Sequence, residues 1–394
     1  LIFTILFLVL PGYHFGQREH IAIILIAPYI FVAGELSSAS SNQNKVIIIT
    51  AIIFAAIGSL IKPIFLLTPF SIIVFRSIHK KCFSELIRID TFIFTLITAI
   101  YAAIIFYLFP EYFDVVRIGI NVYDAYVTLE SGPYGIGTIF IILILISNQL
   151  SRKIIKKKNY YLNNFILSSL MFSIIFIIQG TGWAYHAIPA VTMIAVTYSI
   201  ILAHKLNSHT KTHKPTSQAN ALTLIAALSL LALFVPVGIQ VGHIQPIAAF
   251  EKQAFVKNIR AIGNDKVFVF TSSLVPFFPL ATLDNINWCS RFPALWLVPG
   301  ISNYLDENTP RADVETLEKF KALKQLAINL TIEDIKKYKP EVIAIETSRK
   351  KQAFKHSFNY LDFFNHSSEV KEIWSNYTLI KSTGNFDYYR LKTH

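Results

Sequence analysis

The chain has 394 residues, of which 53% are hydrophobic and 15% are charged, and its formal net charge is +12. Soluble globular domains carry about 25% charged residues, so this composition argues against an ordinary soluble protein and indicates a polytopic helical membrane protein. Two cysteines, Cys82 and Cys289, lie far apart in the sequence and predict neither a disulfide framework nor a metal motif.

Apolar runs separated by short polar turns fill the first part of the chain. We expect about nine short or full spans, which together form a transmembrane helical domain over residues 1–243. The expected spans are 1–12, 21–34, 46–61, 64–75, 91–109, 135–149, 161–179, 187–203 and 221–240. The first run lacks the basic start and the cleavage site of a signal peptide, and we expect the natural chain to begin upstream of Leu1.

A turn is expected at Ile61-Lys62-Pro63, because 46–75 is long for one span and proline ends or kinks a helix. At about 1.5 Å per residue, 21–34 would measure about 21 Å and 64–75 about 18 Å, whereas the hydrocarbon core is about 30 Å thick. Such short helices would place the charged residues at their ends in a wet cavity recessed from the outer surface.

The positions of Lys and Arg predict the orientation of the spans. One alternating set of turns carries 13 of these residues and lies at 36–45, 76–90, 151–160 and 204–220. The other set carries three and lies at 12–20, 61–63, 110–134 and 180–186. Because basic loops stay in the cytoplasm, we expect the second set to face outward, together with the C-terminal region.

After about residue 244 the charge becomes denser, and we expect a soluble α/β domain over residues 244–394. Strands are predicted at 266–272 and 341–348, with a hairpin over 377–392 that turns at 383–385. Helices are predicted at 312–330 and 331–338, the second capped by Thr331 and Asp334. The domain has a net charge of only about +4 without a basic stripe, which argues against nucleic-acid binding.

Ionisable and aromatic residues gather in the turns that we expect outside. Such groups are costly at membrane depth and mark functional sites by default. In chain order the candidates are Gln17, Arg18, Glu19, His20, Lys62, Tyr112, Asp114, Gln179, Trp183, Tyr185 and His186. The turns expected inside contain mostly Lys, Ser and Asn. This asymmetry predicts a site that opens toward the outer face.

The basic members of this set suit a phosphate group. Arg offers two parallel donors and Lys a compact charge, so Arg18 and Lys62, with His20 beside them, are expected to bind phosphate. Glu19 or Asp114 would act as the base toward a hydroxyl group. The residues expected to contact a sugar or an acceptor are Gln17, Tyr112, Trp183, Tyr185 and His186.

Each candidate also has a purely structural explanation. Arg18 and Glu19 can pair with each other at a helix end, and His20 can simply begin a helix. Lys62 can extend its ammonium group to the interface along an apolar stem. The aromatic residues of the fourth outer turn can be ordinary anchors at the membrane surface. The convergence of four turns therefore argues more strongly for a site than any single residue does.

Four stretches resemble the GT-C membrane glycosyltransferases of the protein mannosyltransferase and aminoarabinose transferase type, and most of all their bacterial RgtA/B/C/D-like branch. The stretches are YHFGQREH (13–20), GSLIKPIFLLTPF (58–70), QGTGWAYHAIPA (179–190) and SRFPALWLVPG (290–300). The resemblance covers most of residues 1–205 and, more loosely, the C-terminal region. It implies a GT-C-like helical bundle in the bacterial inner membrane with a periplasmic C-terminal domain.

In this family a turn with Arg and an acidic residue and a later Lys-Pro hinge lie beside the lipid-phosphate sugar donor. Arg18-Glu19 and Lys62-Pro63 match these positions. The usual Arg-Pro-Asp pattern is absent, because Glu19 and His20 follow Arg18. The principal catalytic Asp of the family lies in its first outer loop, so we expect the main base upstream of Leu1.

The resemblance implies transfer of a sugar from a polyprenyl-phosphate donor to a hydroxyl of an envelope glycolipid or glycan, such as lipopolysaccharide. Carboxylates can also hold a divalent cation, Mg²⁺ or Mn²⁺, beside the phosphate. Other functions stay open: a transporter or flippase, a glycan polymerase or ligase, and a non-catalytic envelope-assembly protein. Transporters often show internal repeats, and none is evident in this sequence.

Overall fold

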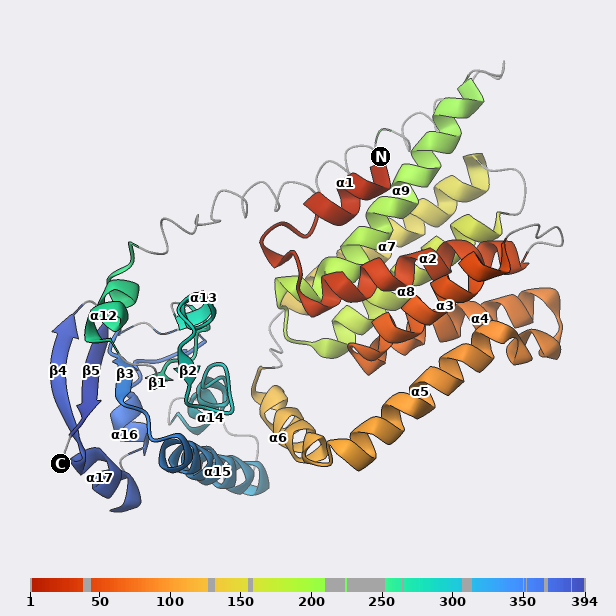
Figure 1. Ribbon diagram of the computed structural model, residues 1–394. Coiled ribbons are helices and arrows are strands. Elements are labelled where there is room, and N and C mark those ends of the chain that lie inside the picture. The colour runs from red at the N-terminus through yellow and green to blue at the C-terminus, as the bar shows by residue number, and fades with distance from the viewer. Residues whose placement is uncertain are drawn as a thin grey trace. The chain divides into compact units, whose positions relative to one another are not determined.

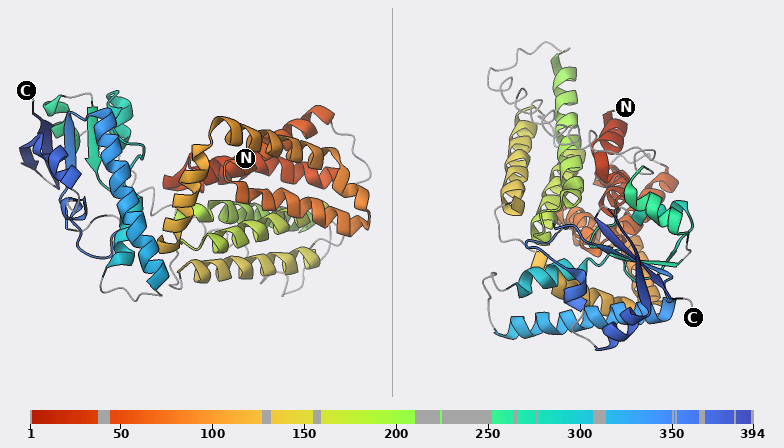
Figure 2. Two further views of the ribbon diagram at one scale, coloured as in Figure 1. Left: turned by 90° about the horizontal axis from the view of Figure 1, so that it is seen from below. Right: turned by 90° about the vertical axis from the view of Figure 1, so that its left-hand side faces the viewer.

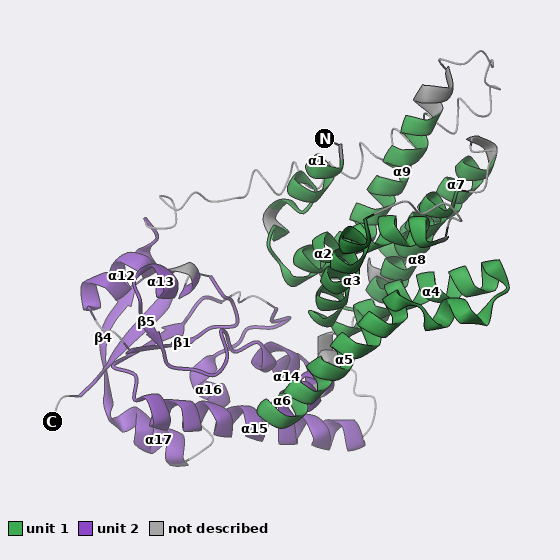
Figure 3. Ribbon diagram, turned by 45° about the vertical axis from the view of Figure 1, so that its right-hand side comes forward, with its two compact units in different colours: residues 1–112, 127–244 green, residues 113–126, 245–394 purple. Residues whose placement is uncertain are grey.

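The computed structural model describes residues 2–37, 44–126, 132–154, 159–209, 224, 252–263, 266–275, 277–306, 314–349, 351, 353–364, 368–383 and 385–392. It is mostly helical, with a small sheet near the C-terminus (Figure 1). Internal packing divides the chain into unit 1, residues 1–112 and 127–244, and unit 2, residues 113–126 and 245–394 (Figure 3). We expected 1–243 and 244–394, and the division by packing also assigns 113–126 to unit 2.

Unit 1 is a bundle of helices. In chain order these are α1 (Ile2–Val9), η1 (Gly12–His14), α2 (Arg18–Ser37), α3 (Lys45–Leu60), η2 (Pro63–Leu66), α4 (Leu67–Lys80), η3 (Phe83–Ile87), α5 (Ile89–Leu108), α7 (Gly132–Ile154), α8 (Tyr160–Gln179), η4 (Ala184–Ala187) and α9 (Ile188–His209). Helices α2, α3, α8 and α9 pack side by side and share one apolar core (Figures 1 and 2).

Local side chains set several of these helix ends. Asn44 precedes α3 and accepts a hydrogen bond from the Val46 amide at 2.9 Å, and Asn159 precedes α8 and accepts one from the Leu162 amide at 3.1 Å. Both bonds satisfy N–H groups that the first helical turn leaves free. Helix α8 ends at Gly180, whose φ of 63° lies in the left-handed region where glycine carries no steric cost.

The chain reverses direction at Lys62, as predicted. A Cβ added at Gly58, near the end of α3, would lie 3.0 Å from the carbonyl oxygen of Ala22, near the start of α2. The end of α3 therefore lies beside the start of α2, and the two helices are antiparallel. Helix α4 runs parallel to α2, because Lys62 bonds to Glu19 at one end of α2 and Lys80 donates to the Leu36 carbonyl at the other end. Segment 46–75 therefore forms a hairpin.

Within the part of the chain that the structure describes, five helical stretches are long and apolar enough to cross a membrane. They are Arg18–Leu36, Ile89–Leu108, Tyr134–Arg152, Tyr160–Gln179 and Ala184–His204. The segments predicted at 1–12, 46–61 and 64–75 form the shorter helices α1, α3 and α4. The segment predicted at 221–240 lies outside the described residues.

The short second span was predicted wrongly. Helix α2 has 20 residues and extends beyond the predicted 21–34 at both ends, which corresponds to about 30 Å. Arg18, Glu19 and His20 are its first turn and do not form a loop before it. The apolar pattern missed this start because polar residues at a helix N-terminus resemble a turn. The burial of Glu19 and His20 therefore comes from packing in the bundle and not from a helix that is too short.

Unit 2 contains a five-stranded sheet with helices on both faces. Its elements are α6 (Glu111–Tyr126), α12 (Ala254–Ile262), β1 (Lys266–Phe270), α13 (Phe277–Leu283), β2 (Asn287–Trp288), α14 (Leu297–Leu305), α15 (Val314–Tyr338), β3 (Val342–Glu346), α16 (Tyr360–Phe364), α17 (Ser368–Ser375), β4 (Tyr377–Thr383) and β5 (Phe386–Leu391). The strand order is β2-β1-β3-β5-β4. Strands β2, β1 and β3 are parallel, and β5 and β4 are antiparallel additions.

Alternate residues of β1 enter two different cores. Phe268 of β1 packs with α14 and α15 on one face, whereas Val267 and Val269 pack with α12 and α13 on the other. Burial on both faces explains why KVFVF is a nearly continuous apolar run. Helix α6 joins the first of these cores through Ile118 and Val122, one helical turn apart, which is why its residues belong to unit 2.

The predicted strands at 266–272 and 341–348 and the hairpin at 377–392 are confirmed as β1, β3 and the β4–β5 pair. The predicted break at Thr331 is wrong, because α15 is one helix of 25 residues. Thr331 donates its hydroxyl to the Ala327 carbonyl at 2.9 Å. Asp334 accepts from the backbone N–H and from Nε of Arg291, each at 2.8 Å. Asp334, which was predicted to cap a helix, therefore binds Arg291 in a distant segment instead.

Candidate functional site

Lys62 occupies the turn between α3 and η2 and lies at the centre of a polar cluster. Its backbone is extended, with φ −144° and ψ 100°, because the following Pro63 excludes the helical conformation at this position. This break in the helix directs the long side chain back toward the start of α2 and the end of α8. The side chain is 20% exposed, so its ammonium group is largely buried but reachable.

Three side chains surround the Lys62 ammonium group. Its Nζ lies 3.2 Å from Glu19 Oε1 and 3.3 Å from His186 Nε2, and it also donates to Gln179 Oε1. These partners come from the first turn of α2, the last residue of α8 and η4. We call these four residues the Lys62 cluster. Residues as far apart in the sequence as Glu19 and His186 therefore meet at one end of the bundle.

Glu19 is fully buried, and its two carboxylate oxygens differ in their environment. Oε1 pairs with Lys62 and lies 3.6 Å from His186 Nε2. Oε2 has no hydrogen-bond partner among the described residues. A buried carboxylate oxygen without a partner is costly, and such atoms in a native structure require an explanation. A bound ligand or water that donates to Oε2 would provide one.

The geometry fixes the orientation of the neutral partners. Gln179 Nε2 donates to the Ile175 carbonyl at 3.2 Å, so its Oε1 faces Lys62. Because the Lys62 ammonium can only donate, His186 Nε2 accepts from it, and the ring proton resides on Nδ1. That proton points to Thr181 Oγ1 at 2.9 Å. His186 is thereby held as a neutral acceptor.

Aromatic rings line the same end of the bundle. Trp183 and Tyr185 stack with ring centroids 5.7 Å apart, and Tyr185 packs edge-on against His186 at 4.4 Å. His14 of η1 lies 5.9 Å from Tyr185. Flat aromatic faces beside polar groups are the surfaces on which sugar rings and amphipathic ligands stack.

The electrostatic state of Lys62 reflects its surroundings. Burial lowers the pKa of its ammonium group, the Glu19 carboxylate raises it, and the guanidinium of Arg18 lowers it further. Arg18 is exposed on the first turn of α2, close enough to act on Lys62 through space. Two cationic side chains thus share this end of the bundle, one buried and one open to solvent.

Of the remaining predicted residues, His20 bonds to the backbone, and Gln17, Tyr112 and Asp114 are exposed. His20 is buried, accepts from the Gly16 amide at 2.9 Å and donates to the Phe7 carbonyl at 2.8 Å, so both ring nitrogens are engaged. Gln17 is exposed before α2. Tyr112 is exposed and interacts with Tyr101 of α5. Asp114 is exposed on α6 in unit 2, so the structure does not join it to the cluster.

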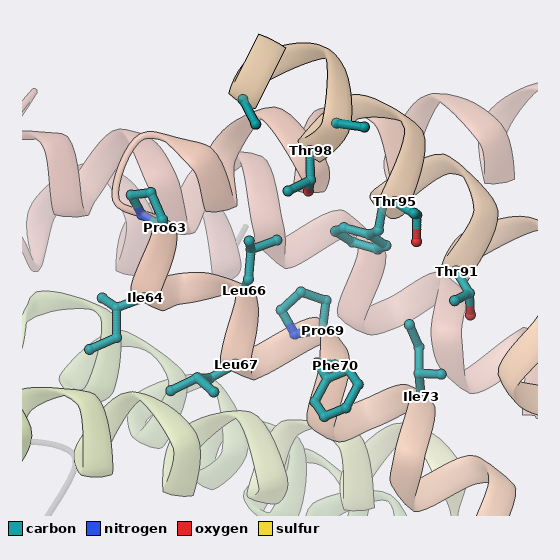
Figure 4. Close-up of a pocket in the computed structure, with 13 residues that line it drawn as sticks. Pro63, Ile64, Leu66, Leu67, Pro69, Phe70, Ile73, Thr91, Thr95 and Thr98 are labelled. Carbon is teal, nitrogen blue, oxygen red and sulfur yellow. The ribbon is translucent and has the colours of Figure 1, made fainter. Parts of the chain in front are cut away.

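An apolar pocket of about 790 Å³ begins at Pro63, next to Lys62 in the chain. One wall is the η2–α4 segment, including Leu66 and Phe70, and the other is α5 (Figure 4). Thr91, Thr95 and Thr98 follow one face of α5 along the pocket. The lining is otherwise apolar, so the pocket suits a hydrocarbon chain more than a polar ligand.

Thr181 and the pocket were not predicted from the sequence. The Thr181 contact depends on the left-handed glycines on both sides of it, whose consequence for side-chain direction is not visible in the sequence. Among the residues that the structure describes, no group of three or more His, Cys, Asp and Glu side chains is placed to hold a metal ion. The expected divalent cation therefore finds no ready set of ligands there.

Comparison of the chain with protein-family models, with curated proteins and with solved structures finds no match in any of the three. We therefore infer the function from the geometry of the Lys62 cluster and the chemistry of its residues.

Proposed function

We propose that this chain is an integral-membrane glycosyltransferase of the bacterial inner membrane. It transfers a sugar from a polyprenyl-phosphate donor to a hydroxyl of an envelope glycolipid or glycan at the outer face. The observation that carries the proposal is the convergence of Lys62, Glu19, Gln179 and His186 at one end of the bundle, with Arg18 beside them. These include the residues at which the sequence resembles the GT-C enzymes.

A membrane location is supported by the apolar helices that the bundle does not cover. Only 6% of the span formed by α5 is buried, although its mean hydropathy of 2.2 is the highest among the candidate spans. Phe92, Ile100 and Phe106 are each more than half exposed. Apolar surface of this size on a helix of 20 residues is stable in a bilayer and costly in water.

The pocket beside Pro63 supports a donor with a long hydrocarbon chain. The phosphate would lie at Lys62 and Arg18, and the chain would extend between α4 and α5 from Pro63 onward. A ligand with a charged head and an apolar tail matches this order of a cationic turn followed by an apolar groove. A water-soluble nucleotide sugar would leave the groove empty.

In the proposed reaction an acceptor hydroxyl oxygen attacks the anomeric carbon of the donor. The bond from that carbon to the phosphate oxygen breaks, and the polyprenyl phosphate leaves with the electron pair. Lys62 and Arg18 stabilise the charge that develops on the leaving phosphate, which is usually the largest contribution to such catalysis. A carboxylate takes the hydroxyl proton, and Glu19 is the buried carboxylate of this site. In-line attack inverts the configuration of the sugar.

The test is transfer of sugar from radiolabelled polyprenyl-phosphate sugars into lipid by the protein, as the cell produces it, in nanodiscs. We expect Arg18→Ala and Lys62→Ala to lower the transfer rate by about 100-fold or more, as expected when charge stabilisation is removed. The matched control is Lys80→Ala, whose ammonium group lies at the other end of α2. Wild-type rates in both site variants would contradict the assigned roles. Movement of the lipid across the bilayer without transfer would favour a flippase.

A further inference from the structure

Unit 2 offers a second place where ligands are expected to bind. The connection that follows β1 leads to β2, at one edge of the sheet. The connection that follows β3 leads to β4, at the opposite edge. The chain therefore departs in opposite directions from two neighbouring parallel strands. In open α/β sheets, ligands bind in the crevice outside the carboxyl ends of such strands.

Two segments are tied to this edge of the sheet. The Leu295 amide donates to the Thr271 carbonyl directly after β1 at 2.8 Å, which places the start of α14 there. The segment that follows β3 forms a loop closed by Lys351, whose Nζ donates to the carbonyls of Ser348 and Phe358 at 2.6 Å each. Lys351 is itself only 7% exposed, so this clamp is buried.

A serine, a histidine and an aspartate meet between these two segments. Ser302 Oγ on α14 lies 3.0 Å from His356 Nε2 on the loop. His356 Nδ1 lies 3.2 Å from Oδ2 of Asp306, the residue that ends α14. When the Ser302 hydroxyl donates to Nε2, the ring proton must be on Nδ1, the nitrogen that lies near the carboxylate. This is the order of contacts by which a serine hydroxyl is activated for attack.

Neighbouring contacts hold the loop against α14. Asn303, next to Ser302, donates from Nδ2 to the Ala353 carbonyl at 2.8 Å and accepts from the Lys355 amide at 2.9 Å. Both partners lie within three residues of His356, so one buried side chain fixes the distance between the helix and the histidine. The contact from Nδ1 to Asp306 is not aligned as a hydrogen bond, and such contacts tighten when substrate binds.

We propose that unit 2 carries a second active site, which hydrolyses carboxylic esters with a small acyl group. Ser302 Oγ attacks the acyl carbon while His356 Nε2 takes its proton, and the alcohol leaves with that proton. Water, deprotonated by the same nitrogen, then releases the acid and restores Ser302. Asp306 is a positioning residue that orients the ring. Ser302 is only 9% exposed, which restricts the acyl group to a small one such as acetyl.

This proposal is independent of the glycosyltransferase proposal. The test treats the full chain in nanodiscs with a small fluorophosphonate probe, maps the adduct by mass spectrometry and follows its rate. We expect one adduct per chain, on Ser302, and labelling at least about 100-fold slower in His356→Ala. In Asp306→Asn the rate falls while the final extent stays at one adduct per chain, because the nucleophile itself is intact.

Ser375→Ala is the matched control, because Ser375 is an exposed serine whose hydroxyl donates to the Glu372 carbonyl. It should label at the wild-type rate, and p-nitrophenyl acetate should be hydrolysed in parallel with labelling across the variants. Absence of an adduct on Ser302 would overturn the proposal. So would a rate in His356→Ala within about tenfold of wild type, provided that the melting temperature of that variant is unchanged.

Discussion

Unit 1 buries ionic groups at both ends of α2, and the two clusters differ in how completely the charges are paired. At the C-terminal end, Arg76 binds Asp90 through two hydrogen bonds, of 2.7 and 3.0 Å. Asp90 also accepts from the Tyr29 hydroxyl at 3.0 Å, and Arg76 reaches the side chain and the carbonyl of Glu85, each at 3.1 Å. We call these four residues the Arg76 cluster.

In the Lys62 cluster at the other end, the buried carboxylate is paired less completely. Its cation is partly exposed, its carboxylate is buried, and Oε2 of Glu19 has no partner among the described residues. In the Arg76 cluster both oxygens of the Asp90 carboxylate accept hydrogen bonds, and these bonds join α2, α4 and α5. The difference indicates that one cluster serves the packing of the bundle, whereas the other leaves capacity for a ligand.

Disrupting the Arg76 cluster should have the largest effect on stability. Arg76→Ala leaves the carboxylate of Asp90 buried and unpaired, which costs about 3–5 kcal/mol. We expect a clear fall in melting temperature in detergent or nanodiscs. The matched control is Arg88→Ala, because Arg88 is 32% exposed, bonds to Glu85 at 2.9 Å and should contribute about 0–1 kcal/mol. Equal melting temperatures for the two variants would remove the structural role assigned to the Arg76 cluster.

The sequence predicted one of these clusters better than the other. Lys62-Pro63 and Arg18-Glu19 interrupt apolar runs, and that contrast was enough to select them. Arg76 and Asp90 lie in a turn that the distribution of Lys and Arg placed inside, where only Arg76 of the two counted toward orientation. Nothing in the sequence distinguishes a buried Arg–Asp pair from two solvated charges, because the pairing depends on how α4 and α5 pack.

The elements of the fold also divide into those set by local sequence signals and those set by tertiary contacts. Strands β1 and β3 and the β4–β5 hairpin follow from apolar runs and turn residues, which are local signals. The start of α2 at Arg18 and the continuity of α15 through Thr331 depend on partners elsewhere in the chain, such as Phe7 for His20 and Arg291 for Asp334. The pairing of Ser302 with His356, 54 residues later, is likewise set by tertiary contacts.

Moving α2 away from α3 should disturb the Lys62 cluster specifically. A Cβ at Gly58 would lie 2.7 Å from Leu25 Cβ and 3.0 Å from the Ala22 carbonyl oxygen, and backbone cannot yield as a flexible side chain does. Gly58→Ala should therefore cost about 1–3 kcal/mol and weaken binding of a polyprenyl phosphate. Calorimetric unfolding and ligand titration on the same samples measure both effects.

Gly135 in α7 provides the control for this substitution, because a Cβ there meets nothing within 4 Å. Gly135→Ala should leave binding unchanged and stabilise the helix by up to about 1 kcal/mol. If Gly58→Ala unfolds and binds like Gly135→Ala, the close approach of α2 and α3 does not support the cluster.

The pH dependence of anion binding should separate Lys62 from an ordinary lysine. Burial lowers the pKa of Lys62, so its charge is lost at a lower pH than in the unfolded chain. At pH values between the pKa of Lys62 in the folded chain and its pKa in the unfolded chain, the folded state binds fewer protons than the unfolded state. The contribution of Lys62 to stability therefore rises with pH in this range, while anion binding falls. Farnesyl phosphate is a suitable probe at alkaline pH, because its second ionisation, at about pH 6, is complete there.

Lys62→Arg tests whether loss of the Lys62 charge causes this pH dependence, because a guanidinium group stays charged throughout the range. We expect the wild-type affinity for farnesyl phosphate to fall by about tenfold for each pH unit above the pKa of Lys62, and the affinity of Lys62→Arg to stay level. Parallel pH profiles for the two proteins would show that another group governs binding.

The smallest expected effect concerns the competition between Glu19 and a bound phosphate. In the wild type the Glu19 carboxylate lies 3.2 Å from the Lys62 ammonium and occupies the position that an anion would take. Glu19→Gln keeps an oxygen that can accept from Lys62 but removes the negative charge. We expect the affinity for farnesyl phosphate at neutral pH to rise by about threefold, which corresponds to about 0.7 kcal/mol.

The same substitution should also change the pH profile, because the carboxylate that raises the pKa of Lys62 is gone. Affinity should therefore start to fall at a lower pH in Glu19→Gln than in the wild type, although it is higher at neutral pH. Sugar transfer should fall in the same variant, since an amide cannot take the proton of the acceptor hydroxyl. Tighter binding together with slower transfer distinguishes a catalytic carboxylate from one that only anchors Lys62. An unchanged affinity would mean that the phosphate does not bind at Lys62, and the contrast between the two ends of α2 would then lose its functional meaning.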